Sequence, residues 1–227
     1  MFSVCDIWCE ERLGVDGFCC LWVKIMGVAS YQVVGVTGFP CVGKSCVSEI
    51  LSGFGYRVID VDKLAHKLLD HPDIFPLIVG RFGDRVVCDG AVLRSVLNLI
   101  VFNDDAALDS LEAITHDLLA LQLFDEVSRA VAPVVIDAPL LYQYGFDKYG
   151  FDKYCDYVIR VVSDYEVRLR RALDRGWSSK LLGKLDDRQK SRPYFGPGDL
   201  LLVNDGNEEE LEFKVRMIMG LVEGGYV

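Results

Sequence analysis

The eight residues from Gly38 to Ser45 constrain the fold of this chain more than any other stretch, because they read Gly-Phe-Pro-Cys-Val-Gly-Lys-Ser. This order matches the phosphate-binding pattern G-x-x-x-x-G-K-[ST], which needs a strand before it and a helix after it. Val33–Val36 is a short β-branched run, and residues 45–51 have the character of the first turns of a helix. The sequence therefore predicts a strand, a phosphate-binding loop and a helix in immediate succession.

The residue types in this loop indicate the chemistry of nucleotide binding. Glycine allows a tight backbone turn whose N–H groups point at phosphate oxygens, and the start of the following helix adds partial positive charge. Lys44 is placed to reach the β- and γ-phosphates, and the Ser45 hydroxyl is placed to bind Mg²⁺. The residues expected to contact the nucleotide are Gly38, Phe39, Pro40, Cys41, Val42, Gly43, Lys44, Ser45 and Cys46.

Length and charge narrow the possible functions further. The 227 residues suffice for one α/β domain with a small lid or inserted subdomain. A net charge of −10 argues against a nonspecific nucleic-acid binder, whereas a small anionic substrate is compatible with a locally basic pocket. No apolar run reaches transmembrane length. The eight cysteines have neither zinc-type nor disulfide-framework spacing, so we expect reduced thiols in the cytoplasm.

The first 31 residues differ from the rest of the chain. They are rich in cysteine with scattered aromatics and show no sustained period, and their charge order is not that of a secretory signal. Met26 lies shortly before the first convincing strand, so the functional chain can begin there. We expect residues 1–31 to be a poorly ordered or peripheral extension and residues 32–227 to form the domain.

Short apolar runs and helical patterns alternate after the loop. Further strands are predicted at residues 56–59, 134–136, 157–162 and 200–203. Such alternation indicates an α/β fold in three layers, with a five-stranded parallel sheet covered on both faces. Asp60 and Asp62 follow the second strand and Asp137 the third, so they are predicted at the edge where such sheets bind ligands.

The stretch between the second and third strands is predicted to be helical. Helices are expected at residues 64–69, 76–82 and 91–102, with an Asp89-Gly90 turn before the last. A longer helix follows, whose apolar residues at intervals of three and four are expected in the core. These residues are Leu108, Leu111, Ile114, Leu118 and Leu121.

The remaining segments have distinct compositions. Residues 145–149 repeat at once as residues 150–154, which we interpret as a tolerated loop insertion. A basic helix is predicted at residues 167–175, and the polar segment 176–197, with Gly and Pro late in it, is expected to be a mobile lid. A final helix starts with Glu208, where acidic residues suit the helix dipole.

From about Gln32 to Leu221 the chain resembles the dephospho-CoA kinase family. After the loop, the residues that carry this resemblance are Ile59-Asp60-Val61-Asp62, Phe82-Gly83, Asp89-Gly90, Arg94, Val101-Phe102, Leu111-Glu112, His116, Asp137 to Leu141, Arg171, Arg175, Asp199, Asn204 and Gly206. Their order and spacing together are specific, although no single one after the loop is.

The resemblance implies transfer of the ATP γ-phosphate to the ribose 3′-hydroxyl of dephospho-CoA, giving coenzyme A. It implies a P-loop kinase-type fold with a helical lid and acceptor insertion, in a monomer or weak homo-oligomer that needs Mg²⁺. The catalytic residues are then Lys44, Asp62 as the base, and Arg171. Arg175, Asn204 and Gly206 join the nucleotide site, and Ser45 holds the metal, with Asp60 or Asp137 holding its waters. The acceptor-binding residues are then Asp60, Asp62, Arg94, His116, Pro139 and Leu140.

The chain also departs from the family pattern, chiefly on the acceptor side. The departures are His66, Asn98, Asp117, Gln143 and Gly176. They leave open a different small-molecule kinase and a nucleotide-binding protein without transferase activity. Two residue-level alternatives also stay open: a solvated basic face for the two arginines, and a buried structural histidine at His116.

Overall fold

The computed structural model describes residues 32–142, 150–190, 196 and 198–222. Within them lies a five-stranded sheet whose paired neighbours all run parallel, in the order β2-β5-β1-β6-β7. The strands are β1 (Val33–Thr37), β2 (Arg57–Asp60), β5 (Val134–Asp137), β6 (Tyr157–Val162) and β7 (Leu200–Val203). Each predicted strand is present to within about one residue, so the predicted parallel α/β sheet is confirmed.

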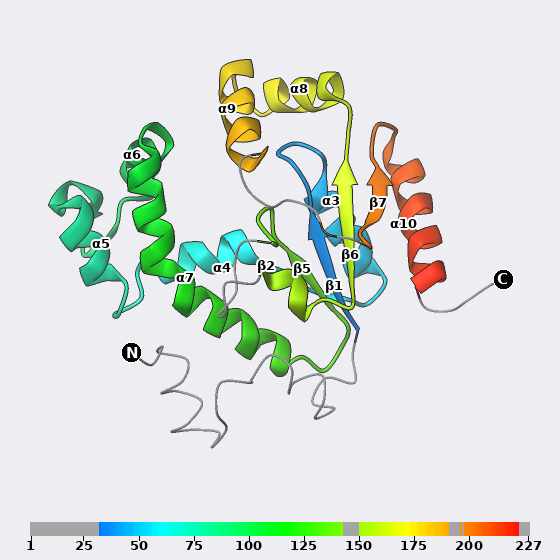
Figure 1. Cartoon of the computed structure of the whole chain (residues 1–227), viewed down its shortest axis with the longest axis horizontal. Coiled ribbons are helices and arrows are strands. Elements are labelled where there is room, and N and C mark those ends of the chain that lie inside the picture. The colour runs from blue at the N-terminus through cyan, green and yellow to red at the C-terminus, as the bar shows by residue number, and fades with distance from the viewer. Residues whose placement is uncertain (1–31, 143–149, 191–195, 197, 223–227) are drawn as a thin grey trace.

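Helices cover both faces of this sheet, as Figure 1 shows. They are α3 (Lys44–Gly53), α4 (Val61–Leu68), α5 (Phe75–Phe82), α6 (Arg94–Asn103), α7 (Asp105–Ser128), α8 (Tyr165–Asp174), α9 (Ser179–Lys190) and α10 (Glu208–Val222). Successive residues of β1 point to opposite faces. Val33 belongs to the core shared with α4 and α7, whereas Val34 belongs to the core shared with α3 and α10. Burial on both faces explains why the central strands β1 and β5 read as continuous apolar runs, whereas the edge strands β2 and β7 each expose residues.

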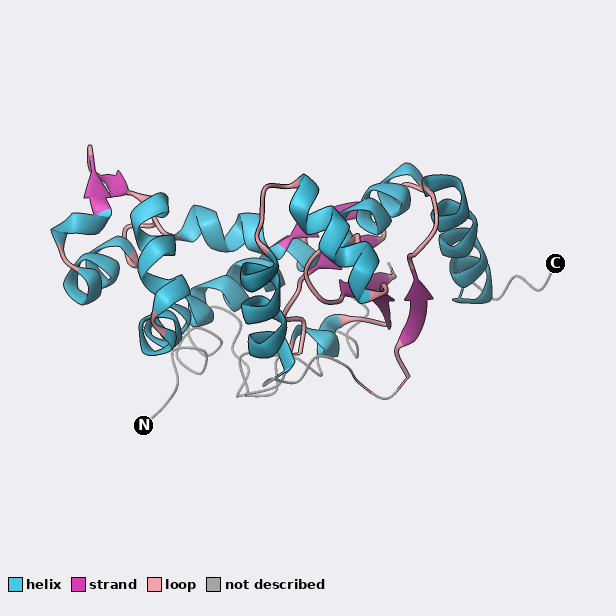
Figure 2. Ribbon diagram, turned by 90° about the horizontal axis from the view of Figure 1, so that it is seen from above, coloured by secondary structure: helices cyan, strands magenta, loops and turns pink. Residues whose placement is uncertain are grey.

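The part of the chain that connects β2 to β5 forms an arm that projects from the sheet (Figure 2). It consists of α5, α6, the β3–β4 hairpin (Val87–Cys88 and Ala91–Val92) and the first half of α7, packed around Ile78, Phe82 and Leu97. The hairpin turn has positive φ at Asp89 (51°) and Gly90 (78°), which confirms the predicted turn. The helix predicted from residue 91 was wrong at its start, because Ala91 and Val92 pair with β3.

Helix α7 passes from the arm to the sheet, and its buried side changes on the way. Leu108, Leu111, Ile114 and Leu118 are only partly buried against the arm, and Leu121 is also only partly buried. The first four of the predicted core residues therefore pack against the arm, while the buried positions lie elsewhere along the helix. Those positions are Ala107, Thr115, Leu119, Ala120, Leu123 and Val127. The prediction of one apolar stripe along the helix was wrong, because the first half of α7 packs against the arm and the second half against the sheet.

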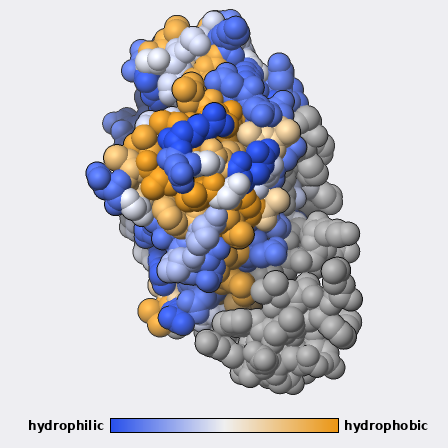
Figure 3. Space-filling model, turned by 90° about the vertical axis from the view of Figure 1, so that its left-hand side faces the viewer, coloured by the Kyte–Doolittle hydropathy of each residue, from blue (hydrophilic) through white to orange (hydrophobic). Residues whose placement is uncertain are grey.

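The outer end of the arm carries exposed apolar side chains. Leu77 is 53% exposed, Leu99 66% and Phe102 41%, and Figure 3 shows apolar surface gathered on this end of the molecule. None of the helices within the described ranges has both the length and the apolar character needed to span a bilayer. These exposed apolar residues thus lie on the surface of the arm, outside the small core that the arm has of its own.

The second copy of the repeated pentapeptide belongs to the core. Its Phe151 is fully buried beneath the sheet, and Gly150 lies so close to Tyr142 that a Cβ there would be 2.3 Å from the Tyr142 Cα. The first copy, residues 145–149, and the extension at residues 1–31 lie outside the described residues.

Candidate active site

The phosphate loop (Gly38–Ser45) leaves the end of β1 and is pressed against β6. Gly38 has φ 149°, and a Cβ there would lie 2.3 Å from the carbonyl oxygen of Val161. Gly43 precedes α3 with φ 96°, and a Cβ there would lie 2.3 Å from the Asn204 amide nitrogen. Both glycines are therefore required by close approach as well as by backbone conformation. Cys41 also has a positive φ, 62°, unusual for a residue with a side chain.

Lys44 folds back across this loop. Its Nζ donates to the carbonyl oxygens of Gly38 at 3.0 Å and Phe39 at 3.3 Å. Burial lowers the pKa of Lys44, while the charges of Asp137 and then Asp62 act in the opposite direction. The ammonium group thus lies within the loop, where the charges of two carboxylates from other elements act on it.

Asp60 and Asp137 end two neighbouring strands at the carboxyl edge of the sheet, where they are paired in register. The Asp137 carboxylate accepts a hydrogen bond from the Ser48 hydroxyl at 2.9 Å and is almost fully buried. Burial raises its pKa, and the Lys44 charge and the Ser48 hydrogen bond oppose this. Asp60 instead caps α4, accepting from the Lys63 N–H at 2.9 Å and pairing with the Lys63 ammonium.

Asp62 lies in the first turn of α4, because the chain becomes helical at Val61. Asp60 and Asp62 therefore do not lie on one extended segment, in which residues two apart would point to the same side. Asp62 is open to solvent, and among the described residues its carboxylate accepts no hydrogen bond and forms no ion pair. The surrounding protein raises its pKa by desolvation, opposed by the Lys44 charge, and the Asp60 charge is a smaller cause.

Helix α8 directs arginines at the phosphate loop, and Arg171 makes the most contacts. Its Nη1 donates to the carbonyl oxygens of Val42 at 3.2 Å and Cys41 at 3.4 Å, and its Nη2 donates to the Asn204 side chain at 3.5 Å. Buried Asn204 also donates to the Val42 carbonyl at 2.8 Å. The alternative of a purely solvated basic face is therefore wrong for Arg171.

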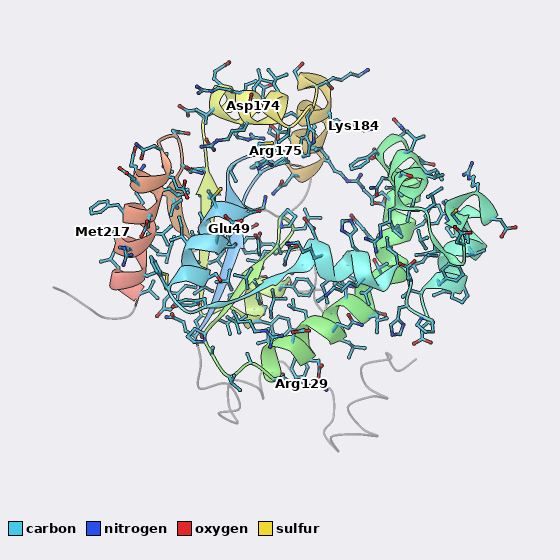
Figure 4. All side chains as sticks on the ribbon, turned by 180° about the vertical axis from the view of Figure 1, so that it is seen from behind. Glu49, Arg129, Asp174, Arg175, Lys184 and Met217 are labelled. Atoms are coloured by element: carbon cyan, nitrogen blue, oxygen red, sulfur yellow. The ribbon has the colours of Figure 1, made fainter. Side chains whose placement is uncertain are left out.

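Two further arginines, Arg168 of α8 and Arg175 directly after its end, lie at the same loop. The Arg175 guanidinium lies 3.9 Å from the Cys41 Sγ, and Figure 4 shows it on the side of α8 that faces the sheet. Arg168, which the sequence did not single out, donates from Nε to the Pro40 carbonyl at 2.9 Å. The signal that could have found it is its spacing of three and seven residues from the other two, which puts all three on one helix face.

Known protein families provide an independent comparison. The family model described as dephospho-CoA kinase matches residues 32–191, which include the loop, the carboxylates and the α8 arginines. The chain belongs to the dephospho-CoA kinase family.

Individual relatives support this assignment over nearly their whole length. Dephospho-CoA kinase of Fusobacterium nucleatum is 30% identical over 191 residues, covering 82% of this chain and 96% of that protein. The Geobacter sulfurreducens dephospho-CoA kinase is 34% identical over 195 residues, with the same coverage of each. A crystal structure from Thermus thermophilus has a TM-score of 0.65 at 28% identity, covering 86% of this chain and 99% of that one. Dephospho-CoA kinase of Campylobacter jejuni, at 22% identity and TM-score 0.57, covers 85% and 98% and shares the fold.

Several residues expected at the acceptor site of a dephospho-CoA kinase have structural partners. Arg94 lies on the arm, where its guanidinium is 3.6 Å from the Asp70 carboxylate. His116 is partly buried in α7, with Nδ1 3.6 Å from an Asp117 oxygen. The carbonyl oxygen of Pro139 accepts from the Gln189 side chain at 3.0 Å, and half-buried Leu140 follows it. Gly206, which was predicted at the nucleotide site, lies in the exposed turn that leads into α10.

One departure from the family pattern has a structural cause. Gly176 follows α8 with φ 77°, and its N–H donates to the Leu173 carbonyl at 2.9 Å. Glycine is favoured in this position after a helix because it has no Cβ. Another departure, His66, lies one turn after Asp62 on α4, where its charge acts to lower the pKa of Asp62. Asn98 and Asp117 are exposed, and Gln143 lies outside the described residues.

The oxygen atoms beside the loop fit a magnesium ion held mainly through water and phosphate. Ser45, Ser48, Asp60 and Asp137 are among the residues that line a cleft of about 480 Å³. In the described part of the chain, no three His, Cys, Asp or Glu side chains form a complete metal cage. Mg²⁺ usually binds through one or two protein oxygens together with nucleotide phosphates, so the hydroxyl and carboxylates present are a suitable donor set.

Proposed function

We propose that this chain transfers the γ-phosphoryl group of ATP to the 3′-hydroxyl of dephospho-CoA, which yields coenzyme A and ADP. The observation that carries the proposal is the Lys44 ammonium, which is hydrogen-bonded within the phosphate loop and on which the charges of Asp137 and Asp62 act. Membership of the family supports the choice of acceptor. Transfer of a phosphoryl group to a hydroxyl requires a cation that neutralises phosphate charge and an open carboxylate that can take the hydroxyl proton.

The donor side binds the triphosphate through the loop. The first N–H groups of α3 and the N-terminal partial charge of that helix face the phosphates. When ATP binds, Lys44 exchanges its two carbonyl partners for phosphate oxygens, and Arg171 and Arg175 lie beside it to neutralise charge on the transferred group. Ser45 would hold Mg²⁺ and Asp137 would bind the water molecules around it, and the ion would supply further charge neutralisation.

The acceptor side relies on Asp62. The acceptor hydroxyl oxygen forms a bond to the γ-phosphorus as the bond from that phosphorus to the ADP oxygen breaks, and the hydroxyl proton passes to the Asp62 carboxylate. The absence of hydrogen bonds to Asp62 within the described residues leaves its carboxylate available for this role. Asp60 is occupied by capping α4, so we assign it to shaping the site.

The test is ADP release from ATP and Mg²⁺ with and without dephospho-CoA, with mass spectrometry of the product. We expect ADP release to depend on the acceptor and the product to gain one phosphate. Shikimate and nucleosides, offered in parallel, should give background rates. Acceptor-dependent release with one of these and not with dephospho-CoA contradicts the proposal, as does nucleotide binding without turnover on any acceptor.

Two expectations on the state of the protein accompany this proposal. We infer a cytoplasmic enzyme that is a monomer or a weak homo-oligomer. The thiols of Cys41, Cys46, Cys88 and Cys155 are free in the structure, in agreement with a reducing compartment. Cell fractionation and light scattering at several protein concentrations test the two points.

A further inference from the structure

Arg168 contacts the phosphate loop in a way that differs from the other arginines of α8. Its Nε donates to the Pro40 carbonyl at 2.9 Å, and its guanidinium carbon lies 5.3 Å from the centre of the Phe39 ring. The residue is only 7% exposed. Arg168 thus grips the second and third residues of the loop from one side, by a hydrogen bond and by a cation–π contact.

The same guanidinium is paired with a carboxylate of α9. The Nη2 of Arg168 donates to the Asp186 side chain, and both side chains are less than a tenth exposed. Beside the pair, Cys41 of the loop packs with Ala172 of α8 and Leu182 of α9. The latter two lie one turn from Arg168 and Asp186 respectively, so the loop, α8 and α9 meet along one continuous buried contact.

Helix α9 also contacts the acceptor side of the site. Gln189, three residues after Asp186, donates to the Pro139 carbonyl at 3.0 Å. Lys184 donates to the Phe102 carbonyl on the arm, and Figure 4 shows it reaching from α9 toward the arm. Arg188 lies 3.6 Å from an Asp105 oxygen at the start of α7. One helix therefore bears on the loop, the segment after β5 and the arm.

Arg168 is connected to the catalytic lysine through the loop backbone. The Phe39 carbonyl, between the Phe39 ring and the Pro40 carbonyl that Arg168 contacts, accepts a hydrogen bond from Lys44. A shift of the backbone at Phe39 and Pro40 therefore changes the position that the Lys44 ammonium has before phosphate binds. The guanidinium fork is what allows one side chain to bind the Pro40 carbonyl and Asp186 together, and a lysine has no such fork.

We propose that Arg168, oriented by Asp186, is a positioning residue that makes the geometry of the phosphate loop depend on the placement of α9. It rests on the nucleotide site of the proposed function. The Arg168 charge is balanced by Asp186, so Arg171 and Arg175 remain the arginines that meet phosphate. With α9 held against the segment after β5 and against the arm, Arg168 fixes the loop segment whose Phe39 carbonyl contacts Lys44.

The kinetic test uses Arg168→Lys and Asp186→Asn, with Arg170→Lys as the matched control on an exposed position of the same helix. We expect kcat to fall at least tenfold in the first two, with KM for dephospho-CoA changed less than threefold and wild-type values in the control. Assays run at least 15 °C below each melting temperature separate this from unfolding. A kcat within threefold of wild type in Arg168→Lys overturns the proposal.

The second test needs no acceptor and uses Trp177, which packs against the contact between Cys41, Ala172 and Leu182. With Trp8 and Trp22 replaced by phenylalanine, we expect Trp177 emission to change when ADP and Mg²⁺ bind. In Arg168→Lys, calorimetry should still show binding while the emission change is at least halved. The proposal is overturned if the Trp177 emission change in Arg168→Lys is as large as in the protein that retains Arg168. It is also overturned if the protein that retains Arg168 shows no emission change. Failure of dephospho-CoA turnover in the wild type contradicts only the proposed function.

Discussion

Asp60 and Asp137 are paired in register on neighbouring strands, yet their carboxylates have different partners. Asp137 accepts from Ser48 on α3, the helix that begins in the phosphate loop. Asp60 accepts from the backbone of α4 and pairs with Lys63. Two adjacent positions at the same sheet edge are thus divided between the nucleotide side and the start of the helix that carries Asp62.

Replacement of Lys44 or Ser45 by alanine is expected to reduce turnover at least about 10²-fold, because both bear on charge that develops near the transition state. The fold should persist, since neither side chain belongs to the buried apolar cores. The measurement is kcat together with the melting temperature. Arg129→Ala, on the exposed end of α7, is the control and should keep the wild-type rate. Near-wild-type rates in either loop variant contradict the assignment of the loop.

Asp62→Asn and Asp60→Asn should have unequal effects. The first removes the proposed base and should lower kcat by about 10²- to 10⁴-fold with little change in ATP affinity. The second keeps a good capping side chain, so it should cost less than about 1 kcal/mol of stability and retain most of kcat. If Asp60→Asn abolishes turnover while Asp62→Asn mainly weakens binding of ATP and Mg²⁺, the two roles are reversed.

Two groups should limit the pH range over which kcat/KM is high, Asp62 on the acid side and Lys44 on the alkaline side. Desolvation raises the pKa of Asp62, so its base form is lost as the pH falls through a value above that of a free aspartate, about 3.9. Burial lowers the pKa of Lys44, so the ammonium is lost with rising pH below the value for free lysine, about 10.4. The check is a profile from pH 4.5 to 10 with the Asp62→Asn variant beside it. An acid limb that persists unchanged in that variant assigns it to another group.

Asp137→Asn should stabilise the protein without nucleotide at neutral pH. Because the folded-state pKa of Asp137 is raised, its stability contribution is fully present below the unfolded pKa and is lost as pH rises through the folded pKa. The amide removes that loss and can still accept from Ser48. The melting temperature should rise by roughly 2–4 °C for each kcal/mol gained. It should converge with that of the wild type near pH 4, and a lower melting temperature at pH 7 contradicts the account.

A chain that starts at Met26 should keep kcat and melting temperature. The family match, the sheet and the loop all lie from residue 32 onward. Thermal melting and the ADP assay on the shortened chain test this. A loss of several degrees would mean that residues 1–25 pack on the domain.

Local patterns predicted the sheet well because the central strands β1 and β5 are buried on both faces and so read as uninterrupted apolar runs, while the partly exposed edge strands β2 and β7 are still apolar at their centres. The loop was equally visible, since its glycines and Lys44 serve local geometry. Asp60 was harder: a strand that passes directly into a helix gives no turn signal, so capping by Asp60 was missed. The structural cause of Gly176 was also missed, although Arg-Gly after a helical run is a usual helix end.

Long-range contacts account for the rest. Nothing local to Arg168 marks it as buried, because its partners Pro40 and Asp186 are far away in the sequence. The core stripe of α7 was misplaced for a similar reason, since the helix has one partner before its middle and another after it. Periodicity identifies a helix face, but only the tertiary fold decides which neighbour that face meets.

The phenylalanine that fills the core at Phe151 is duplicated in the sequence, once in each copy of the pentapeptide. The two pentapeptide copies are identical and contiguous, so removing residues 145–149 and removing residues 150–154 produce the same shortened chain, with Gly-Phe-Asp-Lys-Tyr directly before Cys155. A five-residue deletion within the repeat therefore cannot leave the site under the sheet without its phenylalanine. Point substitutions at Phe151 have no such protection, because they change the copy that the core already uses.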